Sequence, residues 1–422
     1  MSGKKRKVAS CWCGETEAVQ FSPGYLVCKG CGGLFVEHMP EINLTRVTDD
    51  ATDFYGKEYY LSHVQKDYGL PDLDSRSRTD LPERCLHWLR ALLRYKGPQA
   101  KVLELGSAHG GFVAMLREAG FDATGLELSP WLVDYAKKTF GVPMLCGPVE
   151  EQDIKEGSLD VVALMDVLEH LPDPVKTIRR CLELLKPDGI LLIQTPCFPD
   201  DKGYAEMKGD NDAFLFMLKE EEHLNIFGRR SVTEFFRRLG ADYIVFEAAI
   251  FWQYDMFFVV GRQPLSSIPA EAAEEALTKT VPGGRILLAM IDLAEANNAI
   301  GKHLQEVEAD RAARLEAING LTARLQEVEA DRAARLEAIN RLVPLEKEKA
   351  DLIEELQSTS NELESITKKY HDFRSELEKT MTEKAALVLE RNQLMAKGKS
   401  VVNSLSWRIT ASLRYIGKFF MK

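Results

Sequence analysis

Four cysteines near the start of the sequence are spaced as ligands for a metal ion. Cys11 and Cys13 form one close pair in the 422-residue chain, and 14 residues separate it from a second pair, Cys28 and Cys31. Four thiolates bind Zn²⁺ in a closed tetrahedral site, which leaves no position open for a substrate. We therefore expect these cysteines to hold a structural zinc ion rather than a catalytic one.

A second group combines carboxylates with imidazoles, the side chains that move protons. Asp166, Glu169 and His170 lie close together on one expected helical turn, and His223 follows in a separate stretch. An imidazole exchanges its proton near neutral pH and can act as a general base. Three interpretations of His170 stay open: a base or substrate contact, a metal ligand, or a structural residue beside a cofactor. For His223, a structural role and a functional role are equally open.

A turn of small residues separates an apolar run from an amphipathic stretch. It reads E-x-G-x-A-x-G from Glu104 to Gly110, and its small residues let the backbone approach a ligand closely. Glu127 ends the next apolar run about 20 residues later, where a carboxylate accepts hydrogen bonds from ribose hydroxyls. The pattern indicates a nucleoside-containing cofactor and differs from the G-x-G-x-x-G turn of dinucleotide-binding domains. A nicotinamide-dependent or other nucleotide-binding domain is the alternative.

Short apolar runs alternate with amphipathic stretches between residues 97 and 263. The runs are Lys101–Leu105, Ala123–Leu128, Leu159–Met165, Ile190–Gln194, Tyr243–Phe246 and Phe257–Val260. Strands that alternate with helices form βαβ units and a mostly parallel sheet, so we expect an α/β domain. The last two runs lie close together and predict a final hairpin.

These motifs, taken together, resemble the class I S-adenosylmethionine-dependent methyltransferases over residues 97–263. The stretches Asp166–Pro174 and Lys186–Gly189 add to the resemblance. It implies a Rossmann-like sheet of seven strands with an antiparallel last strand, and S-adenosylmethionine as cofactor. Methyl transfer requires an aligned nucleophile and removal of its proton. The expected catalytic set is His170, Glu169, Asp166 and His223.

The resemblance also implies which residues bind the cofactor. Glu104 would hold or orient its methionine end, and Glu127 would bind its ribose. Ala108 departs from the usual glycine. Pro148 stands where relatives often carry an acidic residue that contacts adenine, so a backbone amide near Val149, or the next carboxylate, would serve instead. The implied cofactor-binding set is Glu104, Gly106, Ala108, Gly110, Glu127, Leu128, Val149 and Asp166.

Three smaller resemblances concern metals and a cover for the site. The D-x-x-E-H motif at residues 166–170, together with the distant His223, resembles the metal site of small-RNA 2′-O-methyltransferases, which implies a divalent cation on a pair of substrate hydroxyls. Residues 27–35 resemble a zinc-ribbon knuckle, and similar ribbons precede the catalytic domain in sugar and polyketide-type methyltransferases. Tyr55, Tyr59 and Tyr60 resemble an aromatic segment that covers the active site in similar enzymes; ordinary packing of a helical lid is the alternative.

Residues 301–396 change character and are rich in Ala, Glu, Leu and Arg. Leu304–Asn319 is repeated letter for letter by Leu325–Asn340, and the offset of 21 residues equals three heptads. The apolar spacing predicts a coiled coil, interrupted near Gly320 and Pro344, that joins copies of the chain into a homo-oligomer. A single long solvated helix is the alternative.

Residues 397–422 combine apolar and aromatic side chains with basic ones. A basic amphipathic helix suits an anionic membrane surface; docking to a partner protein is the alternative. We expect neither a transmembrane helix nor a signal peptide, and therefore a cytoplasmic protein, peripheral at the inner face of the membrane. The net charge of -11 argues against general binding to nucleic acid.

A coiled coil followed by a basic terminal helix resembles the methyltransferases that cap bacterial O-antigen polysaccharides at the inner membrane. This implies a sugar hydroxyl of a glycan or lipid-linked glycan as acceptor, and glycan-assembly proteins as partners. The alternatives are a small metabolite or a protein as acceptor, and a scaffold with a vestigial methyltransferase domain.

The predicted domains are a zinc ribbon at 8–40, a helical lid or linker at 41–96, the methyltransferase domain at 97–263, linker helices at 264–300, the coiled coil at 301–396 and the membrane-binding helix at 397–422.

Overall fold

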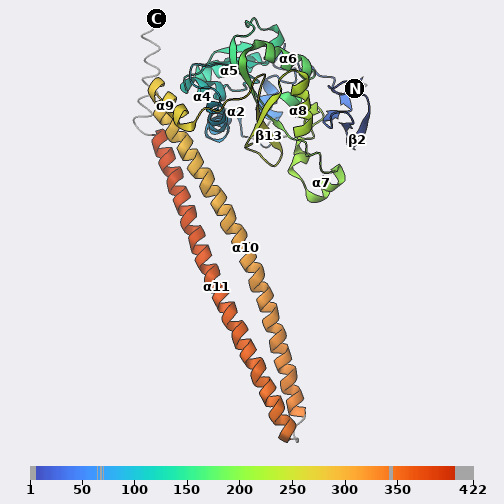
Figure 1. The fold of residues 1–422 in the computed structure, drawn as a ribbon, viewed down its shortest axis with the longest axis vertical. Coiled ribbons are helices and arrows are strands. Elements are labelled where there is room, and N and C mark those ends of the chain that lie inside the picture. The colour runs from blue at the N-terminus through green and yellow to red at the C-terminus, as the bar shows by residue number, and fades with distance from the viewer. Residues whose placement is uncertain (1–5, 64, 67–68, 70, 342–345, 404–422) are drawn as a thin grey trace. The chain divides into compact units, whose positions relative to one another are not determined.

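The computed structural model describes residues 6–63, 65–66, 69, 71–341 and 346–403 (Figure 1). The chain divides into two compact units, Met1–Ile291 and Asp292–Lys422. Residues 404–422, which make up most of the predicted membrane-binding helix, lie outside the described residues.

A seven-stranded sheet forms the centre of the first unit. The strands, in the order in which they lie side by side, are β12 (Tyr243–Glu247), β13 (Asp255–Gly261), β10 (Leu185–Pro196), β9 (Leu159–Met165), β6 (Lys101–Leu105), β7 (Asp122–Glu127) and β8 (Met144–Cys146). β13 runs antiparallel to both neighbours, and the remaining pairings are parallel. The predicted α/β fold class with an antiparallel last strand is confirmed. The short strand β8 is an addition that no predicted run marks.

Helices cover the sheet on both sides. α4 (Gly111–Glu118), α5 (Pro130–Phe140) and α6 (Pro174–Leu184) connect successive strands, because parallel strands need crossover connections. Val161 and Val162 are neighbours on β9 whose side chains point to opposite faces, and both are fully buried. α8 (Arg229–Arg238) joins α6 in the apolar cluster on one of these faces. The carboxyl ends of the parallel strands are therefore held at a common edge.

The cysteine module, residues 8–40, shares a sheet with one strand of the region 97–263. Its strands β2 (Ala18–Ser22), β3 (Tyr25–Cys28) and β4 (Leu34–Val36) are extended by β11 (Asn225–Ile226) in the order β11-β4-β3-β2. The short strand β1 (Arg6–Lys7) pairs separately with β5 (His38–Met39). The predicted zinc ribbon is thus built into the first unit rather than preceding it as a detached domain.

The predicted helical lid contains one helix that changes its winding. α2 (Leu73–Asp80) continues through a π-helical turn, Leu81–Cys85, into α3 (Leu86–Leu93). Tyr59–His63 forms a second π-helical turn. Such turns re-aim the side chains that follow them and occur often at functional sites.

The C-terminal part of the described chain is helical. α9 (Ala270–Thr280) and α10 (Gly284–Arg341) are separated at the predicted break around Pro282, and α11 (Glu346–Asn403) follows. The predicted interruption at Gly320 is wrong, because α10 runs through this residue without a break. One glycine inside a helix costs about 1 kcal/mol, which the good helix formers around it offset.

Within the second unit, α10 and α11 pair as an antiparallel hairpin (Figure 1). Arg314 bridges Asp310 at 2.8 Å and Glu376, on the other helix, at 3.3 Å. Arg335, 21 residues further along, bridges Asp331 at 2.7 Å and Glu355 at 2.6 Å. The two copies of the sequence repeat therefore make the same contacts, and the heptad pattern is used within one chain.

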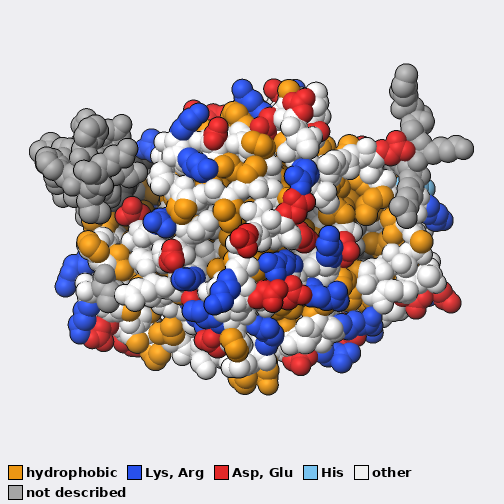
Figure 2. Space-filling view, turned by 90° about the horizontal axis from the view of Figure 1, so that it is seen from above, with side chains coloured by type: hydrophobic (Ala, Val, Ile, Leu, Met, Phe, Trp, Pro, Cys, Tyr) orange, Lys and Arg blue, Asp and Glu red, His pale blue; other side chains and the backbone are white. Residues whose placement is uncertain are grey.

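The surface of the molecule is mixed in character. Figure 2 shows Lys and Arg side chains interspersed with Asp and Glu, with apolar side chains between them. None of the helices in the described part of the chain offers an apolar stretch long enough to cross a bilayer.

Candidate active site

The turn between β6 and α4 has a backbone conformation that leaves room for a ligand to approach closely. Gly106 and Gly110 have positive φ angles of 66° and 81°, and Ala108 adopts the same left-handed region at 44°. A side chain on Gly106 would place its Cβ 2.6 Å from a methyl carbon of Val167, so only glycine fits there. The turn therefore leaves a cradle open at the carboxyl end of β6.

Glu104, at the end of β6, has an oxygen without a partner. The residue is 3% exposed, and its Oε2 atom is buried with no hydrogen bond from any described residue. Burial, and then the nearby Glu127 carboxylate, raise the pKa of Glu104 to about 8. A buried acceptor without a donor is costly. The amino group at the methionine end of S-adenosylmethionine is a donor that fits this position.

Glu127 ends β7 with both carboxylate oxygens on backbone amides. Oε2 accepts a hydrogen bond from the Ala108 amide at 3.0 Å, and Oε1 accepts one from the Leu128 amide at 2.7 Å. Burial raises the pKa of Glu127, whereas these amides lower it. Oε1 also accepts a longer hydrogen bond from the Ser129 amide at 3.4 Å, so Oε2 is the oxygen with a second lone pair to which a ribose hydroxyl can donate. Glu127 and Leu128 line the same cavity as the glycine turn.

The predicted adenine side lies at the 3₁₀ turn Val149–Glu151, which follows Pro148. Val149 and Pro148 both line the cavity. The carboxylate of Glu150 already accepts a hydrogen bond from the Thr177 hydroxyl at 2.6 Å. The backbone near Val149 is therefore the better of the two predicted adenine contacts.

Two arginines missed by the sequence analysis line the same cavity. Arg76 lies on α2, and Arg84 lies on the π-helical turn that follows it. The Nε atoms of both are buried without a hydrogen bond among the described residues. A guanidinium with a free N–H fits a carboxylate such as that of the cofactor's methionine end. Their spacing of about two helical turns is the sequence signal that could have found them.

Asp166 lines the cavity and is held by two side chains. Its φ is 57°, its Oδ1 accepts from Gln194 Nε2 at 3.0 Å, and its Oδ2 lies 3.5 Å from an Arg84 nitrogen. Contrary to expectation, it does not share the short helical turn that carries Glu169 and His170, because its left-handed backbone breaks the chain direction after β9. Asp166 therefore lies outside the turn of Glu169 and His170, although burial and then its charge raise the pKa of Glu169.

Glu169, His170 and His223 come together although His223 is distant in sequence. Their donor atoms all lie within 4.8 Å of one another, and the two imidazole centroids are 4.9 Å apart. His223 Nδ1 donates to the Met217 carbonyl at 2.7 Å, which leaves Nε2 with the lone pair. Burial lowers the pKa of His170 to about 4 and that of His223 to about 3. Both imidazoles are therefore neutral at pH 7.

The predicted aromatic segment lies against this group. The Tyr55 hydroxyl is 3.1 Å from His170 Nδ1, and the Tyr59 hydroxyl donates to Glu222 at 2.7 Å. With Tyr60 they line a cavity of about 420 Å³ that the cofactor residues and the histidines share. Further aromatic lining comes from Phe216, Phe251 and Tyr254, which no sequence pattern marked.

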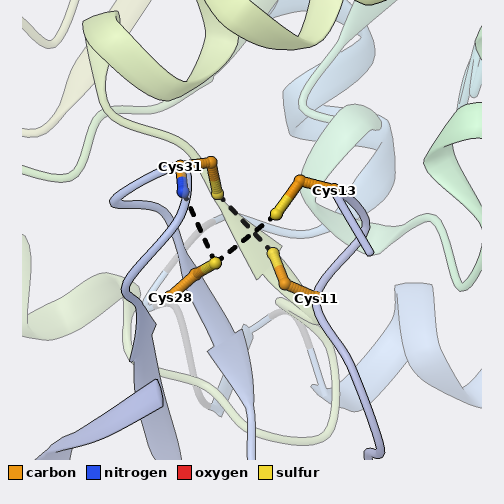
Figure 3. A group of neighbouring side chains, drawn as sticks. All are labelled: Cys11, Cys13, Cys28 and Cys31. Carbon is orange, nitrogen blue, oxygen red and sulfur yellow. Dashed lines mark hydrogen bonds between the residues drawn. The ribbon is translucent and has the colours of Figure 1, made fainter. Parts of the chain in front are cut away.

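The four cysteines of the cysteine module converge (Figure 3). Cys11 Sγ lies 3.6 Å from Cys31 Sγ. Cys13 Sγ lies 3.5 Å from Cys28 Sγ, and no disulfide joins these thiols. The Gly33 amide points at Cys31 Sγ from 3.5 Å, as amides do around bound thiolates. This arrangement fits a tetrahedral Zn²⁺ ion.

Comparison with known proteins agrees with this geometry. Residues 77–244 match the family model of a methyltransferase domain. Ubiquinone biosynthesis O-methyltransferase of Xanthomonas campestris is 34% identical over 128 residues, which are 28% of this chain and 54% of that protein. The enzyme of that name from Xanthomonas axonopodis is 33% identical over the same length. The chain thus spans about half the length of these curated relatives.

Solved structures with a similar region include a methyltransferase complex with the activator Trm112 from Haloferax volcanii, at 18% identity and a TM-score of 0.35, covering 45% of this chain and 95% of that one. Another is an S-adenosylmethionine-dependent methyltransferase from Thermotoga maritima, at 18% identity and a TM-score of 0.34, covering 48% of this chain and 99% of that one. The family match, the sheet order and the cofactor turn lead to one conclusion: residues 77–244 form an S-adenosylmethionine-dependent methyltransferase domain of the class I fold.

Proposed function

We propose that this protein transfers a methyl group from S-adenosylmethionine to a hydroxyl oxygen on a sugar of a bacterial surface polysaccharide. The observation that carries the acceptor chemistry is the pair of neutral imidazoles, His170 and His223, beside Glu169 in the cavity of the cofactor residues. Bound S-adenosylmethionine supplies an electrophilic methyl group. The chain's own residues must orient the hydroxyl and remove its proton.

His170 is the proposed base. When its Nδ1–H donates to the Tyr55 oxygen, Nε2 carries the lone pair on the side of Glu169, whose nearest oxygen is 3.8 Å away. An imidazole that is neutral at pH 7 can accept the hydroxyl proton without first losing one. Burial, and then the Asp166 charge, raise the pKa of Glu169, and an imidazolium forming 3.8 Å away would favour the ionised form of this carboxyl and be stabilised by it.

The same three residues also fit a divalent cation, and we propose this as the second form of the acceptor site. Two imidazoles and one carboxylate are a ligand set that leaves coordination positions open. Their outer partners are in place: the Met217 carbonyl orients His223, and the Thr195 hydroxyl donates to Glu169 at 2.9 Å. A cation here would bind two neighbouring hydroxyls of the acceptor.

Manganese binding separates the two forms. In the cation form, the purified chain binds one Mn²⁺ at this site, detected by electron paramagnetic resonance, and the His223→Gln variant loses it. In the base form, no such ion is found and methyl transfer does not depend on added Mn²⁺. Because the cysteines form a separate group, zinc content is measured in parallel to show that it is unchanged.

A small metabolite is the second candidate acceptor. The name of the ubiquinone biosynthesis relative favours it, and an aromatic cavity lining accepts the flat face of many ring compounds. The sugar hydroxyl is supported by the same lining, since sugar rings also stack on aromatic side chains, and by the tail of the chain.

The C-terminal part of the chain, from α10 to residue 422, supports an enzyme that is attached to a membrane. Leu315 and Leu336 occupy equivalent positions of the repeat, and each is 38% exposed on the hairpin. We propose that these positions join copies of the chain, that residues 397–422 bind an anionic membrane surface and glycan-assembly proteins, and that the four cysteines hold structural zinc. Truncation after Ala396 tests the tether: full cellular function of the shortened chain would show that it is unnecessary.

The deciding experiment offers the full chain methyl-labelled S-adenosylmethionine together with lipid-linked glycan extracts or with small-molecule extracts. Label in the glycan fraction is the expected result. Label only in the small-molecule fraction would favour the second candidate. No label, and no binding of the cofactor by calorimetry, would favour a scaffold with a vestigial domain.

A further inference from the structure

His223 is held in place by the cysteine module. Its carbonyl oxygen accepts a hydrogen bond from the Tyr25 hydroxyl at 2.8 Å, across 198 residues of sequence. Its amide donates to the Lys219 carbonyl at 2.8 Å. The position of the His223 backbone, and hence of its ring, therefore depends on a side chain that lies outside the methyltransferase domain.

The next residue extends this attachment to the other acceptor-side group. The Leu224 amide donates to the Glu169 carbonyl at 2.7 Å, and the Leu224 carbonyl accepts from the Val36 amide at 3.1 Å. β11 then continues the pairing with β4, with Asn225 opposite Phe35. One short segment thus links the Glu169 and His223 backbones to two strands of the cysteine module.

The Tyr25 hydroxyl lies in the interior of the protein. The residue is fully buried, and its apolar cluster contains Leu224 and also Met217, whose carbonyl sets the tautomer of His223. A buried hydroxyl without a partner is costly, so the bond to His223 is maintained in the folded protein. Tyr25 therefore acts on the backbone, the orientation and the surroundings of one imidazole.

The strand that begins at Tyr25 ends at one of the clustered cysteines. β3 spans Tyr25–Cys28, and the Cys28 amide closes the knuckle by donating to the Gly33 carbonyl at 3.0 Å. β4 starts three residues after Cys31 and carries Val36. The two strands that contact the segment at His223 and Leu224 are thus the strand that enters the Cys28–Cys31 knuckle and the strand that follows it.

We infer that Tyr25 is a positioning residue for His223, and that the cysteine module supports the acceptor site from behind without lining its cavity. This inference rests on the proposed methyl transfer for its kinetic effect and on the contacts above for its structural effect. The cofactor turn lies outside this support, because none of the hydrogen bonds or ion pairs of Glu104, Gly106 and Glu127 among the described residues involves the cysteine module. Loss of the Tyr25 hydroxyl should therefore impair the acceptor side alone.

The test compares Tyr25→Phe with Tyr95→Phe in the full chain. Both changes remove one oxygen from a buried tyrosine; Tyr95 donates to Glu247 and does not line the cavity. For Tyr25→Phe we expect kcat to fall about tenfold, since small misplacements of a reacting group cost this much or more. The Kd for S-adenosylmethionine should stay unchanged, and the imidazole NMR signals of His170 and His223 should shift. Tyr95→Phe should change none of these.

Two outcomes overturn the inference: unchanged kcat and imidazole signals in Tyr25→Phe, or equal changes in both variants. A lower melting temperature alone does not support it, because a purely structural tyrosine would show that too. If the wild-type chain transfers no methyl group to any extract, the proposed function fails. The imidazole signals then still decide whether Tyr25 positions His223.

Discussion

The two halves of the cavity are assembled in opposite ways. The cofactor half comes mainly from one strand, turn, helix and strand, between Glu104 and Leu128. The acceptor half gathers Tyr55, His170 and His223 from segments far apart in the chain, and the cysteine module holds His223 from behind. The difference teaches that a binding site made of neighbouring residues can be recognised from a motif, whereas a site made by long-range packing cannot.

The halves also differ in their electrostatics. In the cofactor half, burial raises the pKa of Glu104 to about 8 and leaves one of its oxygens unpaired. In the acceptor half, burial lowers the pKa of His170 and His223, so that they stay neutral. The cofactor half therefore suits a ligand with a positive charge and N–H donors. The acceptor half suits a neutral hydroxyl that gives up a proton.

The largest expected effect is a loss of kcat, without loss of cofactor affinity, in a variant of the acceptor half. His170→Gln removes the proposed base, and we expect kcat to fall about 10²–10⁴-fold, the usual contribution of a general base. The Kd for S-adenosylmethionine, measured by calorimetry, should not change. His87→Gln is the matched control, because this half-buried histidine bonds to the Ala248 carbonyl and does not line the cavity. A matching loss of cofactor affinity in His170→Gln would contradict the separation.

A substitution in the cofactor half should change cofactor binding and leave the acceptor half intact. Glu104→Gln keeps the size of the side chain but removes its charge, and we expect the Kd for S-adenosylmethionine to rise about 10- to 100-fold, because hydrogen bonds to charged groups contribute about 1.5–3 kcal/mol. At saturating cofactor, kcat should remain near the wild-type value. Glu118→Gln, an exposed position on α4, serves as the control. Unchanged affinity in Glu104→Gln would remove this residue from the site.

The neutral histidines should make stability depend on pH. Their pKa values, about 4 and about 3, lie below the ordinary 6.5. Between pH 6.5 and pH 4 the unfolded chain binds protons that the folded chain excludes. The free energy of unfolding therefore falls with falling pH, by about 1.4 kcal/mol per pH unit for each imidazole. Urea unfolding at pH 7 and pH 5 measures this loss.

Buried carboxyls oppose this trend, because burial raises the pKa of Asp255 to about 8 and the folded chain then binds the extra proton. The measured quantity is therefore the difference between the wild type and the His170→Gln, His223→Gln double variant. We expect the double variant to lose less stability on acidification. Parallel losses in both proteins would show that the two imidazoles are not buried in the neutral form.

The smallest expected effect concerns a single proton. At pH 6.5 the Glu104 carboxyl, with a pKa of about 8, is mostly protonated in the free protein. A cofactor ammonium group placed beside it favours the ionised form, so binding should release up to about one proton. Calorimetry in buffers of different ionisation enthalpy measures this release. It should disappear in Glu104→Gln, and its persistence there would point to another group.

Much of the cofactor half was accessible from the sequence because its determinants are local. Gly106 and Gly110 mark a left-handed turn, and Glu127 follows at the distance set by one helix and one strand. Arg76 and Arg84 were missed because a helical arginine pair at this spacing is common on exposed surfaces, and only the tertiary structure shows that their Nε atoms are buried without a partner. The π-helical turn that aims Arg84 has no recognisable sequence pattern.

The helical tail shows a different limit. The 21-residue repeat predicts regular contacts, and Arg314 and Arg335 do make equivalent ion pairs. A heptad pattern, however, specifies an apolar seam without saying whether the partner helix belongs to the same chain. Arg314 and Arg335 on α10 bridge Glu376 and Glu355 on α11, so the partner helix belongs to the same chain and runs antiparallel. Gly320 does not interrupt α10, because the good helix formers around it offset its low helix propensity.

By itself, the sequence determined the α/β fold, the cofactor turn and the four convergent cysteines, since period, small residues and ligand spacing act over short distances along the chain. Only the tertiary structure decided that a left-handed backbone takes Asp166 out of the turn of Glu169 and His170, that His223 meets His170, and that Tyr25 holds it there. The physical reason is the same in each case. Each of these side chains is directed by packing between distant segments, which no local pattern records. The features that direct them are a left-handed residue, an added strand and a buried hydroxyl.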